Sequence, residues 1–257
     1  RGVMSASPEA NATLLDVALA HDIRLVASAL GPPTPELIER AHARDIVVAA
    51  LVGAKSHAQR QVNAGVDVIV AQGTEAGGHT GQVSTMVLVP EVVKAVAPTP
   101  VLAAGGIVTG EQVAAAMALG AQGVWCGSVW LTTAEAETDP VVKQKFLTAT
   151  SSDTVRSRSL TGKPARMLRT PWTDEWEAPE APATLPMPLQ SLLVANAQVR
   201  IARDARTAGS GAESLATYFV GQGVGLMDHI KPARQVVEEM VSGYLEVAER
   251  FASQVTG

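Results

Sequence analysis

Residues 65–81, GVDVIVAQGTEAGGHTG, join an apolar segment directly to a glycine-rich loop that carries one histidine. Residues 65–71 are short, β-branched and bounded by glycine, which is typical of a strand in a parallel sheet rather than of an amphipathic helix. Gln72 ends this strand and His79 lies on the loop beyond it. In barrels of parallel strands the loops at the carboxyl ends carry the active site, so we expect chemistry at His79. A plain turn with a surface histidine is the alternative.

Other residues of the loop have expected roles of their own. Glycine at positions such as 73 and 78 lets the backbone approach a flat ligand closely, and Glu75 supplies a carboxylate that could orient the imidazole or a neighbouring donor. The remaining histidines fall in or beside segments expected to be helical and are interpreted as solvated or capping groups: His21, His42, His57 and His229.

Strands and helices alternate on both sides of the loop. Thr34 with Pro35 is a helix cap followed by a first-turn proline, and Thr109 caps a helix that ends before Gly120. This alternation predicts right-handed crossovers and a parallel sheet. We expect strands at residues 23–30, 46–52, 65–73, 100–107 and 123–131, and helices at residues 35–44, 55–63, 90–96 and 110–119.

Two more glycine sites fall in the last two of these strands. Gly105 and Gly106 close the fourth strand, and Gly127 with Ser128 interrupts the fifth. Bare backbone N–H groups at neighbouring strand ends, a helix N-terminus and a hydroxyl donor together favour a bound phosphate. Close backbone packing is the alternative reading. A GxGxxG dinucleotide fingerprint is absent from the sequence.

Composition limits the kinds of partner. The 257 residues are 47% hydrophobic and 18% charged, enough for one α/β domain with a large core. A net charge of −5 argues against a nucleic-acid surface, and a local basic cluster is interpreted as a solvated face rather than a phosphate site. One cysteine, Cys126, excludes an internal disulfide framework, and no long apolar run or signal-peptide pattern is found, so we expect a cytoplasmic protein without membrane contact. The cluster is Arg156, Arg158, Lys163, Arg166 and Arg169.

Three motifs together resemble the nitronate monooxygenase family, formerly called 2-nitropropane dioxygenases. They are QGTEAGGHTG from residue 72, AAGGIVTGEQVAAAMALGAQGV from residue 103 and CGSVWLTT from residue 126, and the segment YFVGQG at residues 218–223 resembles the family's glycine–glutamine segment. The resemblance implies an FMN-dependent TIM barrel that oxidises alkyl nitronates with O2. Partners would be a small-molecule substrate, O2 and a second copy in a homodimer.

The resemblance also implies roles for individual residues. His79 corresponds to a catalytic base or substrate-orienting group, and Ser128 stands where threonine is commoner but keeps the hydroxyl. Trp130 replaces the usual phenylalanine, which leaves the shape of the adjacent pocket open. Residues expected to bind the cofactor are Gln72, Gly73, Gly78, Gly105, Gly106, Gly127, Ser128 and Gln222.

Three functions stay open at this point. The first is oxidation of a nitronate by FMN and O2. Flavin-dependent enoyl-acyl-carrier-protein reductases share nearly the same motifs, so the second is NAD(P)H-dependent reduction of an enoyl thioester. The third is a binding protein that has lost catalysis, against which the intact Gly77-Gly78-His79 argues.

The domain organisation is expected to depart from a complete barrel. If the two phosphate-site motifs end strands 7 and 8, residues 23–30 form strand 4, and about 100 residues for strands 1 to 3 are missing from this sequence. We assign residues 1–170 to the FMN-binding barrel portion and residues 171–257 to a proline-rich arm and C-terminal helices. Within the latter we expect a loop at 171–188, helices at 189–208 and 231–253, and an apolar stripe from Val236 to Leu245. A polar hairpin around Gly162 is expected at 155–168, after a helix at 143–148.

Overall fold

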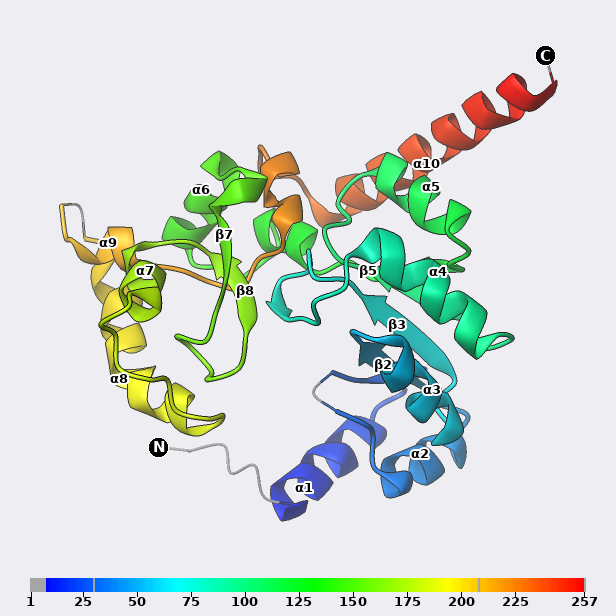
Figure 1. Ribbon diagram of the computed structural model, residues 1–257, viewed down its shortest axis with the longest axis horizontal. Coiled ribbons are helices and arrows are strands. Elements are labelled where there is room, and N and C mark those ends of the chain that lie inside the picture. Colours follow the sequence, from blue (N-terminus) through cyan, green and yellow to red (C-terminus); the bar gives the residue numbers. More distant parts are fainter. Residues whose placement is uncertain (1–7, 30, 208, 257) are drawn as a thin grey trace.

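A computed structural model describes residues 8–29, 31–207 and 209–256 (Figure 1). A five-stranded sheet has the order β1-β2-β3-β5-β6, and every neighbouring pair in it is parallel. The predicted α/β organisation is therefore confirmed. As described, the sheet does not close, since β1 and β6 are not paired with each other. The strands are β1 (Leu25–Ser28), β2 (Val47–Val52), β3 (Val68–Gln72), β5 (Val101–Ala104) and β6 (Gly123–Val124).

Helices connect the consecutive strands of this sheet, as predicted. Thr34 Oγ1 accepts a hydrogen bond from Leu37 N at the start of α2, and Thr109 forms a capping box with Gln112 at the start of α5. These local caps explain why the sequence located both helices. The helices are α1 (Pro8–Leu19), which precedes β1, and α2 (Pro35–His42), α3 (Lys55–Asn63), α4 (Thr85–Val96) and α5 (Gly110–Ala118).

Several predicted boundaries were wrong, including the following three. Helix α4 begins at Thr85 rather than residue 90 because the Glu75 carboxylate, ten residues earlier, accepts hydrogen bonds from Thr85 N and Oγ1. The fifth strand ends at Val124 rather than residue 131, and the chain continues into a 3-10 turn, η1 (Ser128–Thr132). The first strand is limited to Leu25–Ser28, and residue 30 lies outside the described residues.

A second sheet, antiparallel and of order β4-β8-β7, stands beside the first. Its strands β7 (Thr154–Ser157) and β8 (Ala165–Leu168) form the predicted hairpin, and β4 (Gly78–His79) adds the histidine loop to its edge. The two segments are far apart in the sequence, so the hairpin gives the loop a fixed neighbour.

The C-terminal part contains more helix than predicted. The expected loop at residues 171–188 begins with α7 (Pro171–Glu177), which has proline in its first turn and a Thr170 cap. The remaining elements are α6 (Pro140–Thr148), α8 (Leu189–Asp204), α9 (Ala212–Leu215) and α10 (Ala233–Thr256), with 3-10 turns η2 (Ser151–Asp153) and η3 (Gln222–Leu226). None of the helices in the described ranges is long and apolar enough to span a bilayer.

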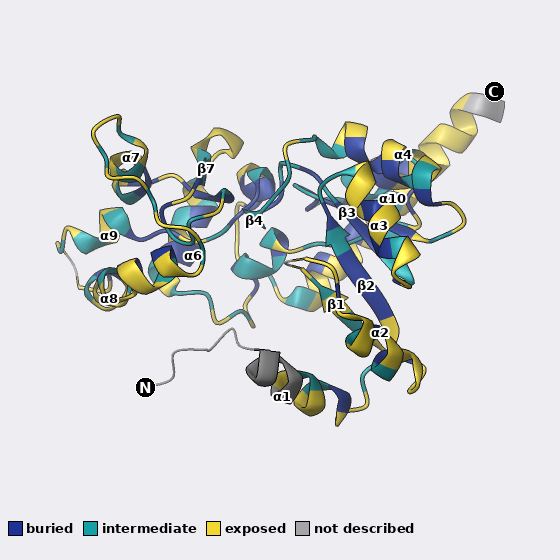
Figure 2. Ribbon diagram, turned by 60° about the horizontal axis from the view of Figure 1, so that its bottom comes forward, coloured by how far each residue is buried: buried dark blue, intermediate teal, exposed yellow. Residues whose placement is uncertain are grey.

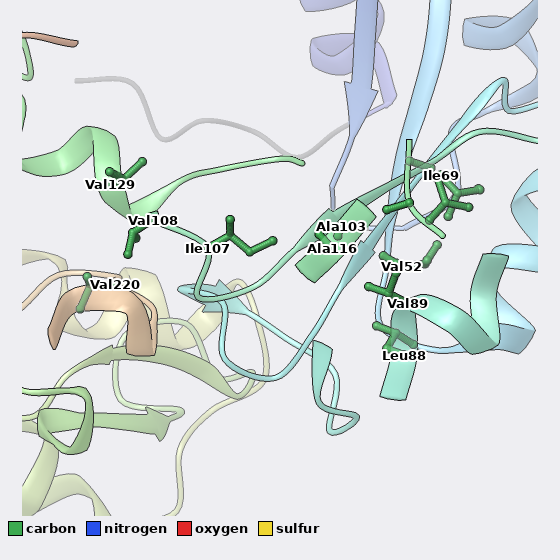
Figure 3. Close-up of a cluster of buried hydrophobic side chains, with 14 of the residues drawn as sticks. Val52, Ile69, Leu88, Val89, Ala103, Ile107, Val108, Ala116, Val129 and Val220 are labelled. Atoms are coloured by element: carbon green, nitrogen blue, oxygen red, sulfur yellow. The ribbon is translucent and has the colours of Figure 1, made fainter. Parts of the chain in front are cut away.

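One apolar core joins the parallel sheet to the C-terminal part. Figure 3 shows Ile69 of β3 near Leu88 and Val89 of α4, and the same cluster extends to Val220. Central strands are buried whereas outer helix faces are exposed (Figure 2). The predicted stripe on α10 is divided, however. Val236 and Met240 are buried, while Val237, Val241 and Leu245 are exposed.

Candidate active site

A cavity of about 300 Å³ lies at the carboxyl ends of β3, β5 and β6. Parallel strands present their carboxyl ends at one edge of the sheet, and the three predicted motifs meet there for that reason. Six of the eight predicted cofactor residues line the cavity: Gln72, Gly78, Gly105, Gly106, Gly127 and Ser128. Its apolar lining includes Leu51, Ile107, Trp125, Leu131 and Phe219.

Glycine occurs at the positions that line this cavity for different structural reasons. Gly105 and Gly106 have φ values of +124° and +69°, a region that L side chains rarely adopt. A Cβ on Gly105 would also lie 2.5 Å from Thr85 Oγ1. Gly127 has no such constraint, since a Cβ there would meet no atom within 4 Å. Gly127 therefore leaves open space on the cavity side of the chain, as a cradle for a ligand requires.

Ser128 keeps one donor for a ligand. Its Oγ accepts a hydrogen bond from Gly221 N at 2.8 Å, which ties η1 to the C-terminal segment. The hydroxyl hydrogen has no partner among the described residues, so Ser128 can donate it to an anion. The N-terminus of α5 does not take part in this cavity, because Thr109 and Gln112 cap it and the lining ends at Val108.

His79 lines a second cavity, of about 460 Å³, that shares Leu51 and Gln72 with the first. His79 and Gly78 pair with Ala165 and Arg166 of β8, so the position of the imidazole is set by a sheet as well as by its own loop. The ring centroid lies 6.3 Å from that of Phe219. The predicted catalytic residue and the predicted phosphate site thus line two neighbouring cavities that have Leu51 and Gln72 in common.

The environment keeps His79 neutral. Burial lowers the pKa of the imidazole below its ordinary value of 6.5, and the positive charge of Lys163 lowers that pKa further. Its Nε2 lies 2.9 Å from Thr161 Oγ1. A neutral imidazole at pH 7 can accept a proton, which a general base requires.

Two predicted cofactor residues lie outside the first cavity. Gly73 faces α4, where a Cβ would lie 2.1 Å from Thr85 Oγ1, so glycine is needed there for packing. Gln222 lines a third cavity, together with Glu75 and Thr85. The Glu75 carboxylate accepts hydrogen bonds from Thr85 N and Oγ1 at the start of α4 and forms none with His79, so of the two expected roles it orients a neighbouring donor and not the imidazole.

Two of the five residues of the basic cluster, Arg156 and Arg166, make internal contacts, whereas Arg158, Lys163 and Arg169 are exposed as expected. Arg166 is 8% exposed, and its Nε donates to Thr74 O at 2.9 Å. Arg156, its cross-strand neighbour, donates from Nη2 to Thr80 O at 3.2 Å. Arg169 pairs with Asp174 at 2.7 Å. The interpretation as a solvated face was therefore wrong for Arg166, which with Arg156 holds both ends of the histidine loop.

Cys126 lines the first cavity but is not a nucleophile. Burial raises the pKa of its thiol to about 11, so the group stays protonated at neutral pH. Neither Thr161 nor the two arginines were identified from sequence as parts of the site. The hydrophilic turn at residues 158–164 was the only signal near Thr161, and it does not indicate which loop it contacts.

Comparison with known proteins assigns the chain to a family. Residues 4–243 match Nitronate monooxygenase. The chain belongs to this family. The family member named "Putative monooxygenase Rv1533", from Mycobacterium tuberculosis, is 68% identical over 99% of this chain and 68% of its own length. The chain aligns with less than half the length of other relatives named nitronate monooxygenase.

Solved structures agree with the nitronate monooxygenase assignment. FabK from Thermotoga maritima has a TM-score of 0.80 and 34% identity, covering 97% of this chain and 76% of that one. A nitroalkane oxidase from Streptomyces ansochromogenes has a TM-score of 0.82 and 29% identity, covering 95% of this chain and 70% of that one. The five-stranded sheet is accordingly an open portion of a TIM barrel, and the protein is an oxidoreductase of a flavin-using family.

The site fits a flavin. Positive-φ glycines, the open space at Gly127 and the free Ser128 donor form an anion cradle, while Trp125 and Phe219 supply flat apolar walls. Leu51 and Gln72 line both this cavity and the cavity of His79, so a ring system held beside these two residues would lie near the histidine. Ligand cavities of several hundred Å³ are of the usual size for such cofactors.

Proposed function

We propose that this protein is an FMN-dependent nitronate monooxygenase that oxidises alkyl nitronates with O2. The observation that carries the proposal is that the cavity lined by Gly105, Gly106 and Gly127 lies beside the cavity of His79 and shares Leu51 and Gln72 with it. FMN, when bound, supplies the redox chemistry by accepting an electron from the substrate. The family match and the likeness to a nitroalkane oxidase support the substrate class.

The residues of the chain would divide the work. Ser128 and the glycine backbone would bind the phosphate, and Gln72 would lie beside the ring system. Neutral His79 would accept the α-proton of a neutral nitroalkane, whereas a nitronate arrives deprotonated and needs only orientation. Gly73 would act through packing, since a Cβ there would meet Thr85. Gln222 would act from the neighbouring third cavity, which shares Gly105, Gly106 and Ile107 with the first.

The second candidate is NAD(P)H-dependent reduction of an enoyl thioester, which the likeness to FabK favours. The basic cluster around Arg166 gives this candidate little support as a binding site for a carrier or coenzyme, because Arg156 and Arg166 donate to loop carbonyls and Arg169 is paired with Asp174. Arg158 and Lys163 of that cluster remain for an external anion.

Anaerobic mixing separates the candidates. Flavin-loaded protein is mixed with propionate-3-nitronate or with NADPH while flavin absorbance is followed. We expect a rapid change with the nitronate and none with NADPH. Bleaching by NADPH alone would select the reductase, and no change with either reagent would contradict both.

The cofactor site has a separate test in Gly127→Val. The added side chain would project into open space rather than against protein, so it should obstruct the phosphate and reduce FMN to well below one per chain. Gly106→Val is less informative, because a φ of +69° would strain the backbone of any β-branched residue. Circular dichroism of Gly127→Val should match the wild type. Full FMN content in that variant would remove the assignment.

A further inference from the structure

Thr161 contacts His79 from the turn between β7 and β8. The two residues are 82 positions apart in the sequence, and Thr161 Oγ1 lies 2.9 Å from His79 Nε2. No other hydrogen bond to the His79 ring is formed within the described residues. The imidazole therefore has one fixed partner, and the chemistry of that partner determines which ring nitrogen carries the proton.

The other hydrogen bonds of Thr161 identify its role in this pair. Its hydroxyl donates to Lys163 O at 3.0 Å, and Oγ1 accepts from Lys163 N at 3.3 Å. A hydroxyl has one hydrogen and two acceptor lone pairs. When its hydrogen is donated to Lys163 O, Thr161 Oγ1 is an acceptor toward the ring, and this arrangement favours His79 Nε2 as the donor.

We propose that Thr161 is a positioning residue that holds His79 as its Nε2–H tautomer and leaves Nδ1 as the nitrogen that accepts the substrate proton. The inference rests on the proposed function, in which His79 is the base. A base with a fixed tautomer always presents the same nitrogen to the substrate. No fraction of the protein is then in the unproductive tautomer.

The turn that carries Thr161 is itself held firmly. Gln190 Nε2 donates to Ser159 O at 3.0 Å, and Ser191 Oγ donates to Leu160 O at 3.0 Å. Gln190 is fully buried. Helix α8 therefore holds the backbone next to Thr161 in place. The position of the Thr161 hydroxyl relative to His79 of β4 follows from these contacts.

The charges around His79 act in one direction. Lys163 follows Thr161 in the turn and disfavours the imidazolium, and His57 and Arg60 of α3 line the same cavity. No carboxylate is among the residues that line it. The Thr161 oxygen is thus the group that stabilises a protonated His79, and its removal should make protonation harder.

The test compares Thr161→Val, which keeps the shape, with Thr161→Ser, which keeps the hydroxyl. Protein labelled with ¹⁵N-histidine is studied by NMR, and the His79 signals are identified by their loss in His79→Asn. We expect wild type and Thr161→Ser to show a protonated Nε2 and an unprotonated Nδ1, and Thr161→Val to show a mixture of tautomers.

Kinetics with two substrates give a second readout. Thr161→Val should lower kcat for a neutral nitroalkane about 10-fold, the size of one hydrogen bond to a charged group, with little effect on nitronate turnover. Its acid limb should move to lower pH, and serine should restore both properties. A structural role alone would not move the pH limb.

The outcomes distinguish this inference from the proposed function. A wild-type His79 protonated on Nδ1, or an unchanged tautomer in Thr161→Val, would overturn the role of Thr161 whatever the activity. If the tautomers mix as expected while nitroalkane turnover is unaffected, positioning stands and the assignment of His79 as base fails. If Thr161→Val does not fold, the tautomers that NMR shows for the wild type and for Thr161→Ser still test the role of Thr161.

Discussion

At the scale of single residues, the proposed chemistry depends on His79, a histidine whose pKa is lowered by its surroundings. Burial and the charge of Lys163 both lower the pKa of His79, and its loop leaves the ring at the wall of a cavity. A base is useful when its unprotonated form predominates at the working pH. A free histidine has a pKa near 6.5. The surroundings of His79 lower this pKa, so the imidazole stays unprotonated down to a lower pH.

His79→Asn tests this role. The variant should keep FMN but lower turnover of a neutral nitroalkane by a factor on the order of 10², the usual size of general-base catalysis, and should affect nitronate turnover less. In the wild type, kcat/KM for the nitroalkane should fall as pH drops through a value below about 6.5, since protonation removes the base and the pKa is lowered. Equal small losses on both substrates would remove the assignment, and loss of flavin would make His79 a cofactor residue.

At the scale of elements, the β7–β8 hairpin acts as a support for the histidine loop. Arg166 and Arg156 are cross-strand neighbours, and they donate to carbonyl groups near the two ends of the loop, Thr74 and Thr80. Arg166 Nη1 also donates to Thr154 Oγ1 at 3.0 Å, which joins β8 to β7. A glycine-rich loop has little conformational preference of its own, so its shape comes from these contacts.

Arg166→Leu tests how much the hairpin contributes to the stability of the histidine loop. The change leaves Thr74 O without its donor inside the protein, which lowers the free energy of unfolding by about 1–3 kcal/mol. Nitroalkane turnover should also fall, because His79 is on the next strand of the same sheet. Urea denaturation and kinetics measure the two effects. Arg169→Ala is the matched control, and its exposed pair with Asp174 should matter little; an equal loss there would contradict the loop-support role.

At the scale of the whole molecule, the C-terminal segment completes the packing of the sheet. Helix α10 crosses the start of α5 (Figure 1), and Gly110 meets Gly243 at the crossing. A Cβ on Gly110 would lie 2.5 Å from Tyr244 N. Two backbones approach this closely only where neither carries a side chain. Helix α5, which starts beside the cavity lined by Gly105 and Gly106, is therefore held by the end of the chain.

Gly110→Ala should separate α10 from α5 and lower the free energy of unfolding by about 1–3 kcal/mol, the usual cost of overpacking. Gly211→Ala is the control, because a Cβ there would meet no atom within 4 Å and its φ of −62° suits alanine. The control should be neutral or slightly stabilising. Thermal unfolding of both variants measures the difference, and an unaffected Gly110→Ala would refute the close crossing.

The amino-acid sequence by itself determined the order of strands and helices and the places of the glycine sites. Hydrophobic runs, Thr34 and Thr109 caps, and the glycines at residues 105, 106 and 127 are local signals, and the structure brings these glycines to one cavity as predicted. Such signals can be read from a short segment alone, because the interactions that produce them involve residues only a few positions apart.

Only the tertiary structure decided which distant groups meet. The start of α4 depends on Glu75, the Ser128 oxygen is occupied by Gly221 N, and the His79 partner Thr161 comes from a hairpin 82 residues away. The tertiary structure also placed Gln222 in a different cavity from Gly127. It buried Arg166, whose Nε donates to Thr74 O of the histidine loop. The hydrogen bonds among these groups form only after the chain has brought distant segments together, and no local pattern in the sequence records that encounter.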